Sequence, residues 1–477
     1  MSRVAVVALA IVSMAHVGSP DTFFGGKAGP YDVRVSVRLP GVIPGRAQVT
    51  VRVSDPGHVT SPGSHHVTVR AGQWNVGLNG APPAETLAPV PGDPSLFASE
   101  LWFMTAQPYE LAVAVDGPQG RGDAVVPVMA LATAERPMPP WLGSVLAALG
   151  IFLTLGLLTI VGTAVRESGL PPGAQPDAPR RRRGRIAVVI AGIVAALALW
   201  GGDVWWNAEA SAYGRFIVYR PFDATASLAG RTLTLDIRDP RWTGAPIPQS
   251  MYNALTPDHG KLMHLFLVRD DENAMAHVHP VARTRAALAF DVNVPPLPPG
   301  HYRVYADIVH ESGYAQTLVS SVDLGEQTQR EAAAERTPTD PDDSWFAGTN
   351  APEIVWERGV DPIVAGKDRD LRFFVRDASG AELTVEPYMG MAAHVLIASR
   401  DGSVFAHLHP AGSIAMAALQ RFSGGAASPH AGHDMPMEGH VAIPYAFPKP
   451  GAYRVFVQIK REGTVRTAAF DVDVRQR

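Results

Sequence analysis

The sequence predicts a mainly β protein of three immunoglobulin-like β-sandwich domains, with two transmembrane helices between the first domain and the second. Short runs of alternating apolar and polar residues recur along the chain, and turn-forming residues separate them, since 45 Gly and 42 Pro are present. This alternation is typical of half-buried strands. Two long uncharged segments interrupt the pattern, and an internal repeat occupies the second half of the chain.

Length and composition limit the classes of protein to which this chain can belong. At about 100–200 residues per domain, 477 residues leave room for roughly three domains. The 41 basic and 45 acidic residues give a net charge of −4, so we expect no nucleic-acid partner. The chain has no cysteine, which excludes disulfides and thiolate metal ligands. A metal site would have to use His, Met, carboxylate or backbone groups.

The N-terminal part predicts a targeting segment followed by the first sandwich. Residues 1–19 combine Arg3 with an apolar run, as in a secretory signal peptide or an N-terminal anchor. Residues 22–135 contain YDVRVSV, AQVTVRV and HHVTVRA, in which apolar residues stand two apart. These runs predict an extracytoplasmic β-sandwich of ordinary immunoglobulin-like size.

Residues 141–165 form a run of 25 residues without a charge, long enough to cross a bilayer, and residues 186–206 form a second apolar segment. The connecting residues 166–185 include five arginines between positions 180 and 185, so the positive-inside rule places this loop in the cytoplasm. We therefore expect a protein of the cell membrane, with the lipid bilayer as a partner and the large domains on the extracytoplasmic side.

The second half of the chain contains a duplication. The segments KLMHLFLVRDDENAMAHVHP and MAAHVLIASRDGSVFAHLHP align at an offset of 130, and the later PGHYRVYADI and PGAYRVFVQI align at 151. The second copy therefore has 21 extra residues between these two motifs. We predict two sandwiches, residues 213–325 and 351–475, joined by a polar linker at residues 326–350.

Three histidines recur in each copy at the same spacing. In a hairpin with a two-residue turn at Asp401 and Gly402, His394 lies opposite His409, and the equivalent register sets His264 opposite His279. Residues two apart in a strand share a face, so a third imidazole joins each pair. The predicted metal ligands are His264, His277 and His279 in the first copy and His394, His407 and His409 in the second.

Neutral imidazole suits Cu(II), Zn(II) or Ni(II), and three such ligands leave a coordination position open. Side chains that could fill this position are Met251, Met263 and His259 in the first copy, and Met389 and Met391 in the second. The insertion in the second copy includes SPHAGHDMPMEGH, which has the composition of a metal-binding loop and adds His430, His433, Met435, Met437 and His440. Because thioether selects Cu(I), we predict copper, with zinc as the alternative.

Two parts of the chain resemble known families. The N-terminal sandwich, through AGPYDVRVSVRLPG and PYELAVAVDGPQGRGDAVVPV, resembles the YtkA-like and FixH-like extracytoplasmic domains. The repeated H…H-x-H-P unit is similar to a family of secreted or membrane-tethered bacterial domains that are often considered metal-associated. This resemblance implies sandwiches outside the cytoplasmic membrane with a role in handling copper or another heavy metal.

The sequence contains no G-x-S-x-G, P-loop, dinucleotide-binding or H-E-x-x-H motif, so we expect no enzyme. The leading hypothesis is a membrane-anchored protein that binds or relays copper and meets another envelope or metal-handling protein. One alternative is a structural or protein-interaction module of the cell envelope with structural histidines. Another is a pH sensor, because opposed imidazoles repel each other once protonated.

Overall fold

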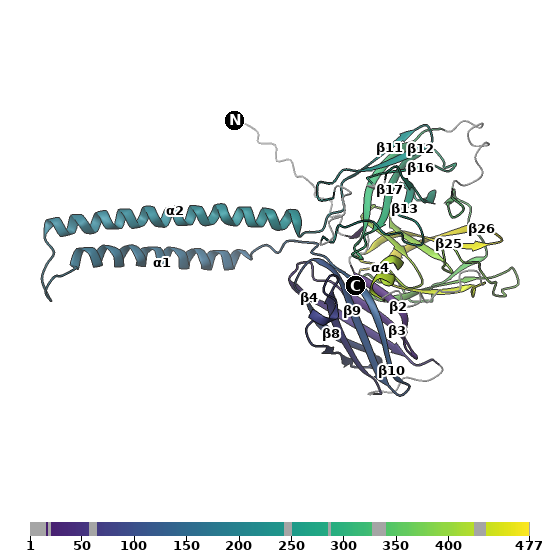
Figure 1. Cartoon of the computed structure of the whole chain (residues 1–477), viewed down its shortest axis with the longest axis horizontal. Coiled ribbons are helices and arrows are strands. Elements are labelled where there is room, and N and C mark those ends of the chain that lie inside the picture. The colour runs from purple at the N-terminus through teal and green to yellow at the C-terminus, as the bar shows by residue number, and fades with distance from the viewer. Residues whose placement is uncertain are drawn as a thin grey trace. The chain divides into compact units, whose positions relative to one another are not determined.

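The computed structural model describes residues 16–17, 21–56, 64–242, 250–284, 288–326, 340–423 and 436–476. It divides into two units, of which one comprises residues 1–133 and 220–477 and the other residues 134–219. The first unit holds the strands and the second holds two long helices (Figure 1). The described strands pair into six sheets, two for each of three sandwiches, which confirms the predicted mainly β fold class.

The N-terminal sandwich follows the predicted alternation. In β3 every second residue is buried, from Tyr31 to Val37, and β4 repeats the pattern. One sheet has the order β2-β3-β4-β8-β7 and the other has β10-β9-β5-β6. The strands are β2 (Thr22–Ala28), β3 (Tyr31–Arg38), β4 (Gly45–Ser54), β5 (His66–Gln73), β6 (Glu85–Thr86), β7 (Ala88–Val90), β8 (Asp93–Phe103), β9 (Gln107–Gly117) and β10 (Gly120–Ala130).

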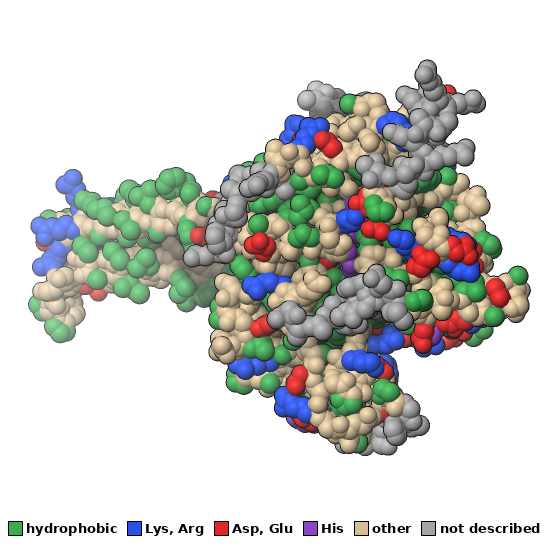
Figure 2. Space-filling model, turned by 45° about the vertical axis from the view of Figure 1, so that its right-hand side comes forward, with side chains coloured by type: hydrophobic (Ala, Val, Ile, Leu, Met, Phe, Trp, Pro, Cys, Tyr) green, Lys and Arg blue, Asp and Glu red, His purple; other side chains and the backbone are tan. Residues whose placement is uncertain are grey.

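The helical unit consists of α1 (Pro140–Glu167) and α2 (Ala178–Phe216), both long and apolar enough to cross a membrane. Their surfaces are largely hydrophobic (Figure 2). The arginines expected in the 166–185 loop lie instead in the first turns of α2. Asp177 caps this helix by accepting a hydrogen bond from the Arg180 backbone N–H at 2.9 Å, and arginine is a strong helix former. At its other end α2 continues past residue 206, into the region predicted to begin the second sandwich.

The first repeat forms a sandwich whose five-stranded sheet has the order β18-β17-β13-β14-β19. The last strand, β19, lies in the predicted linker 326–350, so part of that segment belongs to the sheet. The opposite sheet has the order β11-β12-β16-β15. The strands are β11 (Ala224–Ala229), β12 (Thr232–Ile237), β13 (His264–Arg269), β14 (Met275–Val278), β15 (Val281–Ala282), β16 (Ala289–Asn293), β17 (Gly300–Val309), β18 (Ala315–Leu324) and β19 (Ser344–Phe346).

The second repeat has sheets ordered β1-β23-β22-β25-β26 and β20-β21-β24. Strand β1 comes from the predicted signal peptide or anchor, and its backbone pairs in parallel with β23. A short helix, α4 (Met416–Phe422), lies within the predicted insertion. The strands are β1 (His16–Val17), β20 (Ile354–Glu357), β21 (Arg369–Val375), β22 (His394–Ser399), β23 (Val404–Leu408), β24 (His440–Tyr445), β25 (Gly451–Arg461) and β26 (Thr464–Val474).

The histidine-bearing strands of both repeats are buried on both faces. In β13, Leu265 and Leu267 belong to the core of their own sandwich, whereas Phe266 belongs to a second apolar cluster that both repeats share. In that cluster Tyr305 of the first repeat stacks on Phe405 of the second, with ring centroids 4.1 Å apart. The two five-stranded sheets therefore meet at a common interface, which explains why HLFLVR and HVLIAS each contain four consecutive apolar residues.

One histidine of the first repeat has a purely structural environment. His310 is fully buried and donates through Nδ1 to the Asn253 backbone carbonyl at 2.6 Å. The rings of Phe222, Trp242 and Tyr252 surround it. This burial lowers the pKa of His310 to about 4. It is a core histidine that is held neutral.

We expect Phe405→Ala to lower the free energy of unfolding of the repeats by about 3–5 kcal/mol, because it removes an aromatic ring from the shared cluster and leaves a cavity. Guanidinium denaturation of the full chain measures this loss. Val355→Ala is the control, since Val355 is 42% exposed and its truncation should change stability by no more than about 0.5 kcal/mol. Equal effects of the two substitutions would contradict a buried interface at Phe405.

His310 should make stability depend on pH below neutrality. Its folded pKa lies below the unfolded value of 6.5, so the unfolded state binds more protons between these values and stability falls as the pH drops from 6.5 to about 4. The loss from this one group is about 3 kcal/mol. Replacing it by His310→Gln should flatten the slope of unfolding free energy against pH in this window. The matched control is His301→Gln, an exposed histidine of β17; an unchanged slope in His310→Gln would refute the assignment.

Candidate metal centre

The backbone register of each hairpin sets its histidines side by side. Leu265 pairs with Val278 in the first repeat and Val395 with Leu408 in the second, which confirms the predicted register. One residue further from the turn of each hairpin stand the predicted opposed pairs, His264 with His279 and His394 with His409. In the first repeat, one ring nitrogen from each of His264, His277 and His279 lies within 4.8 Å of the other two.

The two sets of histidines form one cluster rather than two separate sites. The His264 and His407 ring centroids are 5.6 Å apart across the interface between the repeats, and those of His277 and His394 are 6.0 Å apart. A seventh histidine, on the loop before β13, joins them. We call this group the histidine cluster; its members are His259, His264, His277, His279, His394, His407 and His409.

Hydrogen bonds orient the three imidazoles of the first group. His264 Nε2 faces the Asp258 backbone carbonyl at 3.1 Å, and His277 Nδ1 faces Gln458 Oε1 at 3.0 Å. His279 Nδ1 faces Asp343 Oδ1 at 2.9 Å. Each of these partners is an acceptor, so each imidazole donates its N–H outward. The remaining nitrogens, His264 Nδ1, His277 Nε2 and His279 Nε2, therefore keep their lone pairs.

Two of these lone pairs face each other at close range. His264 Nδ1 and His277 Nε2 are 3.1 Å apart, and a neutral imidazole has only one N–H, which the outward bond already uses. An extra proton is disfavoured, because burial and the neighbouring imidazoles lower the pKa of both rings well below the usual histidine value. A metal ion would satisfy both lone pairs: two nitrogens on one tetrahedral ion lie about 3.3 Å apart. The residues present fit a metal.

The orientation of Gln458 supports this hydrogen-bond arrangement. Its Nε2 donates to Ser344 Oγ at 2.7 Å, which leaves Oε1 as the atom that faces His277. The Tyr388 hydroxyl lies 3.3 Å from the same His277 nitrogen and donates its own proton to the Asp342 carbonyl at 2.9 Å. Both neighbours of His277 Nδ1 thus act as acceptors.

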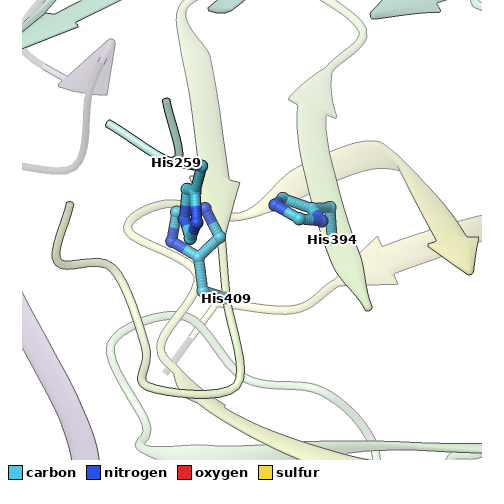
Figure 3. A group of neighbouring side chains, drawn as sticks. All are labelled: His259, His394 and His409. Carbon is cyan, nitrogen blue, oxygen red and sulfur yellow. The ribbon is translucent and has the colours of Figure 1, made fainter. Parts of the chain in front are cut away.

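A second group contains His259, His394 and His409, whose ligand atoms also lie within 4.8 Å of one another (Figure 3). His259 has a positive φ of 51° and precedes Gly260 in a tight turn. The Asp258 carboxylate accepts a hydrogen bond from the Ala417 backbone N–H of α4 at 2.7 Å, which holds this turn against the second repeat. Burial lowers the pKa of both His259 and His394. His259, named in the sequence as an extra ligand of the first copy, thus lies beside the histidines of the second.

His407 lies beside His394 and His409, as predicted, but it also contacts the first repeat. Its Nδ1 lies 3.1 Å from Asp307 Oδ2 of the first repeat, and its ring lies between the two groups, 5.6 Å from His264 and 5.5 Å from His394 between centroids. The support is reciprocal, because His277 of the first repeat meets Gln458 of the second. Asp307 and Gln458 occupy equivalent positions in PGHYRVYADI and PGAYRVFVQI, so the repeat itself contained the signal that sequence reasoning missed.

Several buried ring nitrogens of the cluster have no hydrogen-bond partner within the described ranges. Burying such a group costs free energy unless it finds a partner. A protein rarely retains several buried polar atoms without partners in one place unless they bind a ligand. Five such ring nitrogens together would be unusual for an interface with a purely structural role. These atoms are His259 Nε2, His279 Nε2, both ring nitrogens of His394, and His407 Nε2.

The segment predicted as a linker contributes to the site. Asp340 and Asp343 form a third candidate group with His279, again with ligand atoms within 4.8 Å. Lys261 Nζ lies 2.5 Å from Asp340 Oδ2, so this carboxylate already has a cationic partner. Asp343 accepts from both the backbone and the ring of His279. We therefore assign it the role of orienting that ring.

The other predicted ligands lie elsewhere. Met437 packs against the core of the second repeat, and exposed His440 on β24 contacts Glu382 at 2.7 Å. Met263 belongs to the core of the first repeat. His430, His433 and Met435 lie outside the described residues, and their role in capturing a metal stays a prediction.

Comparisons with known proteins match part of the chain to a domain family to which no function is assigned. A family model described as "Domain of unknown function (DUF8832)" matches residues 228–324 and 352–476, which correspond to the two repeats. No curated protein matches the chain. Several solved structures are similar to the chain, but their identities and TM-scores are so low that the likeness carries nothing about function.

Three of these structures illustrate the likeness. The adhesin FdeC of Escherichia coli is 9% identical, with 96% of this chain and 98% of that chain covered and a TM-score of 0.13. The ICAM-5 ectodomain fragment is 10% identical, with 94% and 77% covered and a TM-score of 0.16. Invasin, a bacterial integrin-binding protein, is 9% identical, with 93% and 60% covered and a TM-score of 0.15.

Proposed function

We propose that this is a membrane-anchored, non-enzymatic protein that binds a transition-metal ion between its two repeats, on the extracytoplasmic side. The observation that carries the proposal is the buried contact between His264 Nδ1 and His277 Nε2. Both rings are oriented by acceptors on their outer nitrogens, so two lone pairs meet where a proton is disfavoured and a metal ion fits.

Copper is the first ion to consider and zinc the second. The cluster offers only imidazole nitrogen, with carboxylates close by, and such ligands suit Cu(II) and Zn(II). At a given nitrogen site Cu(II) binds most tightly among the divalent first-row metals. The carboxylate of Asp343 behind His279 is the kind of outer partner that raises the basicity of a metal-bound imidazole.

The membrane helices support the extracytoplasmic placement. Five arginines lie in the first turns of α2, next to the turn that joins it to α1, and such residues stay in the cytoplasm. If both helices cross the bilayer, all three sandwiches lie on the opposite side. There the protein would receive its ion from solvent or from another envelope protein and hold or pass it on.

A second candidate is an envelope interaction module in which the histidines only join the repeats. His277 and His407 favour it, because each forms a hydrogen bond with the opposite repeat, through Gln458 and Asp307 respectively. This candidate accounts for those two rings. It does not account for His394, neither of whose ring nitrogens has a partner among the described residues.

The metal-binding proposal predicts that the full chain, purified in detergent and stripped with a chelator, binds Cu(II) and becomes more stable. At a free ion concentration of 100 times Kd, the gain in unfolding free energy is about 2.7 kcal/mol. Calorimetric titration and thermal unfolding measure the two effects. The double variant His264→Ala, His277→Ala should lose the tightest binding, whereas His301→Ala, which removes an exposed histidine, should retain it. If the double variant binds Cu(II) as tightly as the parent chain, the site is refuted, and a chain that binds neither Cu(II) nor Zn(II) would favour the interaction module.

Asp343→Asn should weaken metal binding without removing a ligand. The amide oxygen can still accept a hydrogen bond, but the negative charge behind His279 is lost, and such changes typically lower metal affinity about 10–100-fold. The control is Asp323→Asn, which changes the exposed carboxylate that pairs with His301. Competition with a chelator of known affinity measures the two variants; equal affinities would show that Asp343 does not act on the site.

A further inference from the structure

We infer that the histidine cluster holds two metal ions in unlike positions, one among His264, His277 and His279 and the other among His259, His394 and His409. This inference rests on the proposed function and extends it from one ion to two. The two groups share no residue, and each supplies three ring nitrogens within 4.8 Å of one another.

One ion cannot account for both groups. Protein sites for Zn(II) and Cu(II) take three or four protein ligands, whereas the cluster holds seven imidazoles. The first group is complete without the second, because its three outer nitrogens already have their acceptors. The unpartnered nitrogens of His259 and His394 would then remain buried without a ligand, and a second ion removes that cost.

The two positions differ in how firmly their ligands are held. In the first group every side chain is at most 4% exposed, and acceptors fix which nitrogen faces inward. In the second group His394 has no hydrogen-bond partner among the described residues to orient it, and His259 is only partly buried on its turn. The first position is therefore the tight one. The second, which is closer to solvent through His259, is the one that exchanges its ion.

The second position requires both repeats. His259 comes from the loop before β13, whereas His394 begins β22 and His409 directly follows β23. An ion bound there connects the first repeat to the second, in addition to the Tyr305–Phe405 contact. Loading this position should make the two repeats unfold together.

His407 lies between the two positions. Its ring centroid is 4.4 Å from that of His409 and 5.5 Å from that of His277, and its Nε2 has no partner among the described residues. Asp307 holds its Nδ1, so Nε2 is the nitrogen left for a metal. His407 can serve as an additional ligand to either ion, and it offers a route for an ion to pass from the second position to the first.

The test counts ions in the full chain and asks which histidine each one needs. After loading with Cu(II) and removal of excess metal, elemental analysis should find two ions per chain, and the Cu(II) electron paramagnetic resonance spectrum should show two interacting ions. His259→Asn should bind one ion with the spectrum of an isolated Cu(II). Asparagine suits this substitution, because it tolerates the positive φ of His259 better than most residues. The control is His301→Asn, which should bind two.

Two further measurements separate the possible outcomes. Thermal unfolding of the metal-free proteins shows whether His259→Asn folds as the parent does, and His394→Gln tests the same position from the other repeat. One ion in the parent chain, retained in both variants, would overturn the second position and leave the proposed function intact. No ion in the parent chain would overturn both. Two ions in the parent and one in each variant would establish the pair.

Discussion

The burial of a histidine-bearing sheet face against its own duplicate is the constraint on which the rest of the structure depends. A strand with one solvent-exposed face can carry histidine on that face without desolvating the imidazole. Strands β13, β14, β22 and β23 have no solvent-exposed face. Each imidazole on the shared face must therefore find a partner for both nitrogens or pay for its desolvation. The acceptors Asp258, Asp343 and Gln458 meet part of this need in the first group. The inner ring nitrogens of this group keep their lone pairs, and these lone pairs converge.

The two repeats have similar backbones but different side chains at several equivalent positions. His259 and Met389 stand at equivalent positions, share a φ of 51°, and each precedes a glycine with a φ of 80°. Asp307 and Gln458 are likewise equivalent, yet one is a carboxylate and the other an amide. The backbone thus repeats while the side chains diverge. One half of the cluster is consequently well oriented by neighbours, and the other half is less constrained.

Local features of the fold could be predicted from the sequence, and contacts between distant segments could not. The hairpin register followed from turn length and strand period, because both act over a few residues. The alternation in β3 and β4 followed for the same reason. The meeting of the two repeats was not predicted, since each sandwich was considered by itself. The apolar residues between the histidines, such as Phe266 and Phe405, were the available sign that this face is buried.

The same distinction explains the errors in the candidate site. His259 was assigned to the wrong group because its loop crosses to the other repeat, and nothing in the local sequence specifies that crossing. The segment before β19 looked like a linker because it is polar and rich in proline and aspartate. Its Asp343 is polar for a different reason, as the acceptor for a buried imidazole. Arginines next to an apolar run suggested a loop, although Asp177 allows the helix to begin before them.

The strands that bear the H-x-H motif would be edge strands if the duplicated sandwiches stood alone. Strand β19 covers β14 and strand β1 covers β23, and both covering segments come from outside the hairpins that they protect. An uncovered edge offers unpaired backbone groups to any other chain and is a common starting point for aggregation. The covering strands thus protect an apolar, histidine-rich hairpin from strand exchange with other chains, which a bare edge would allow.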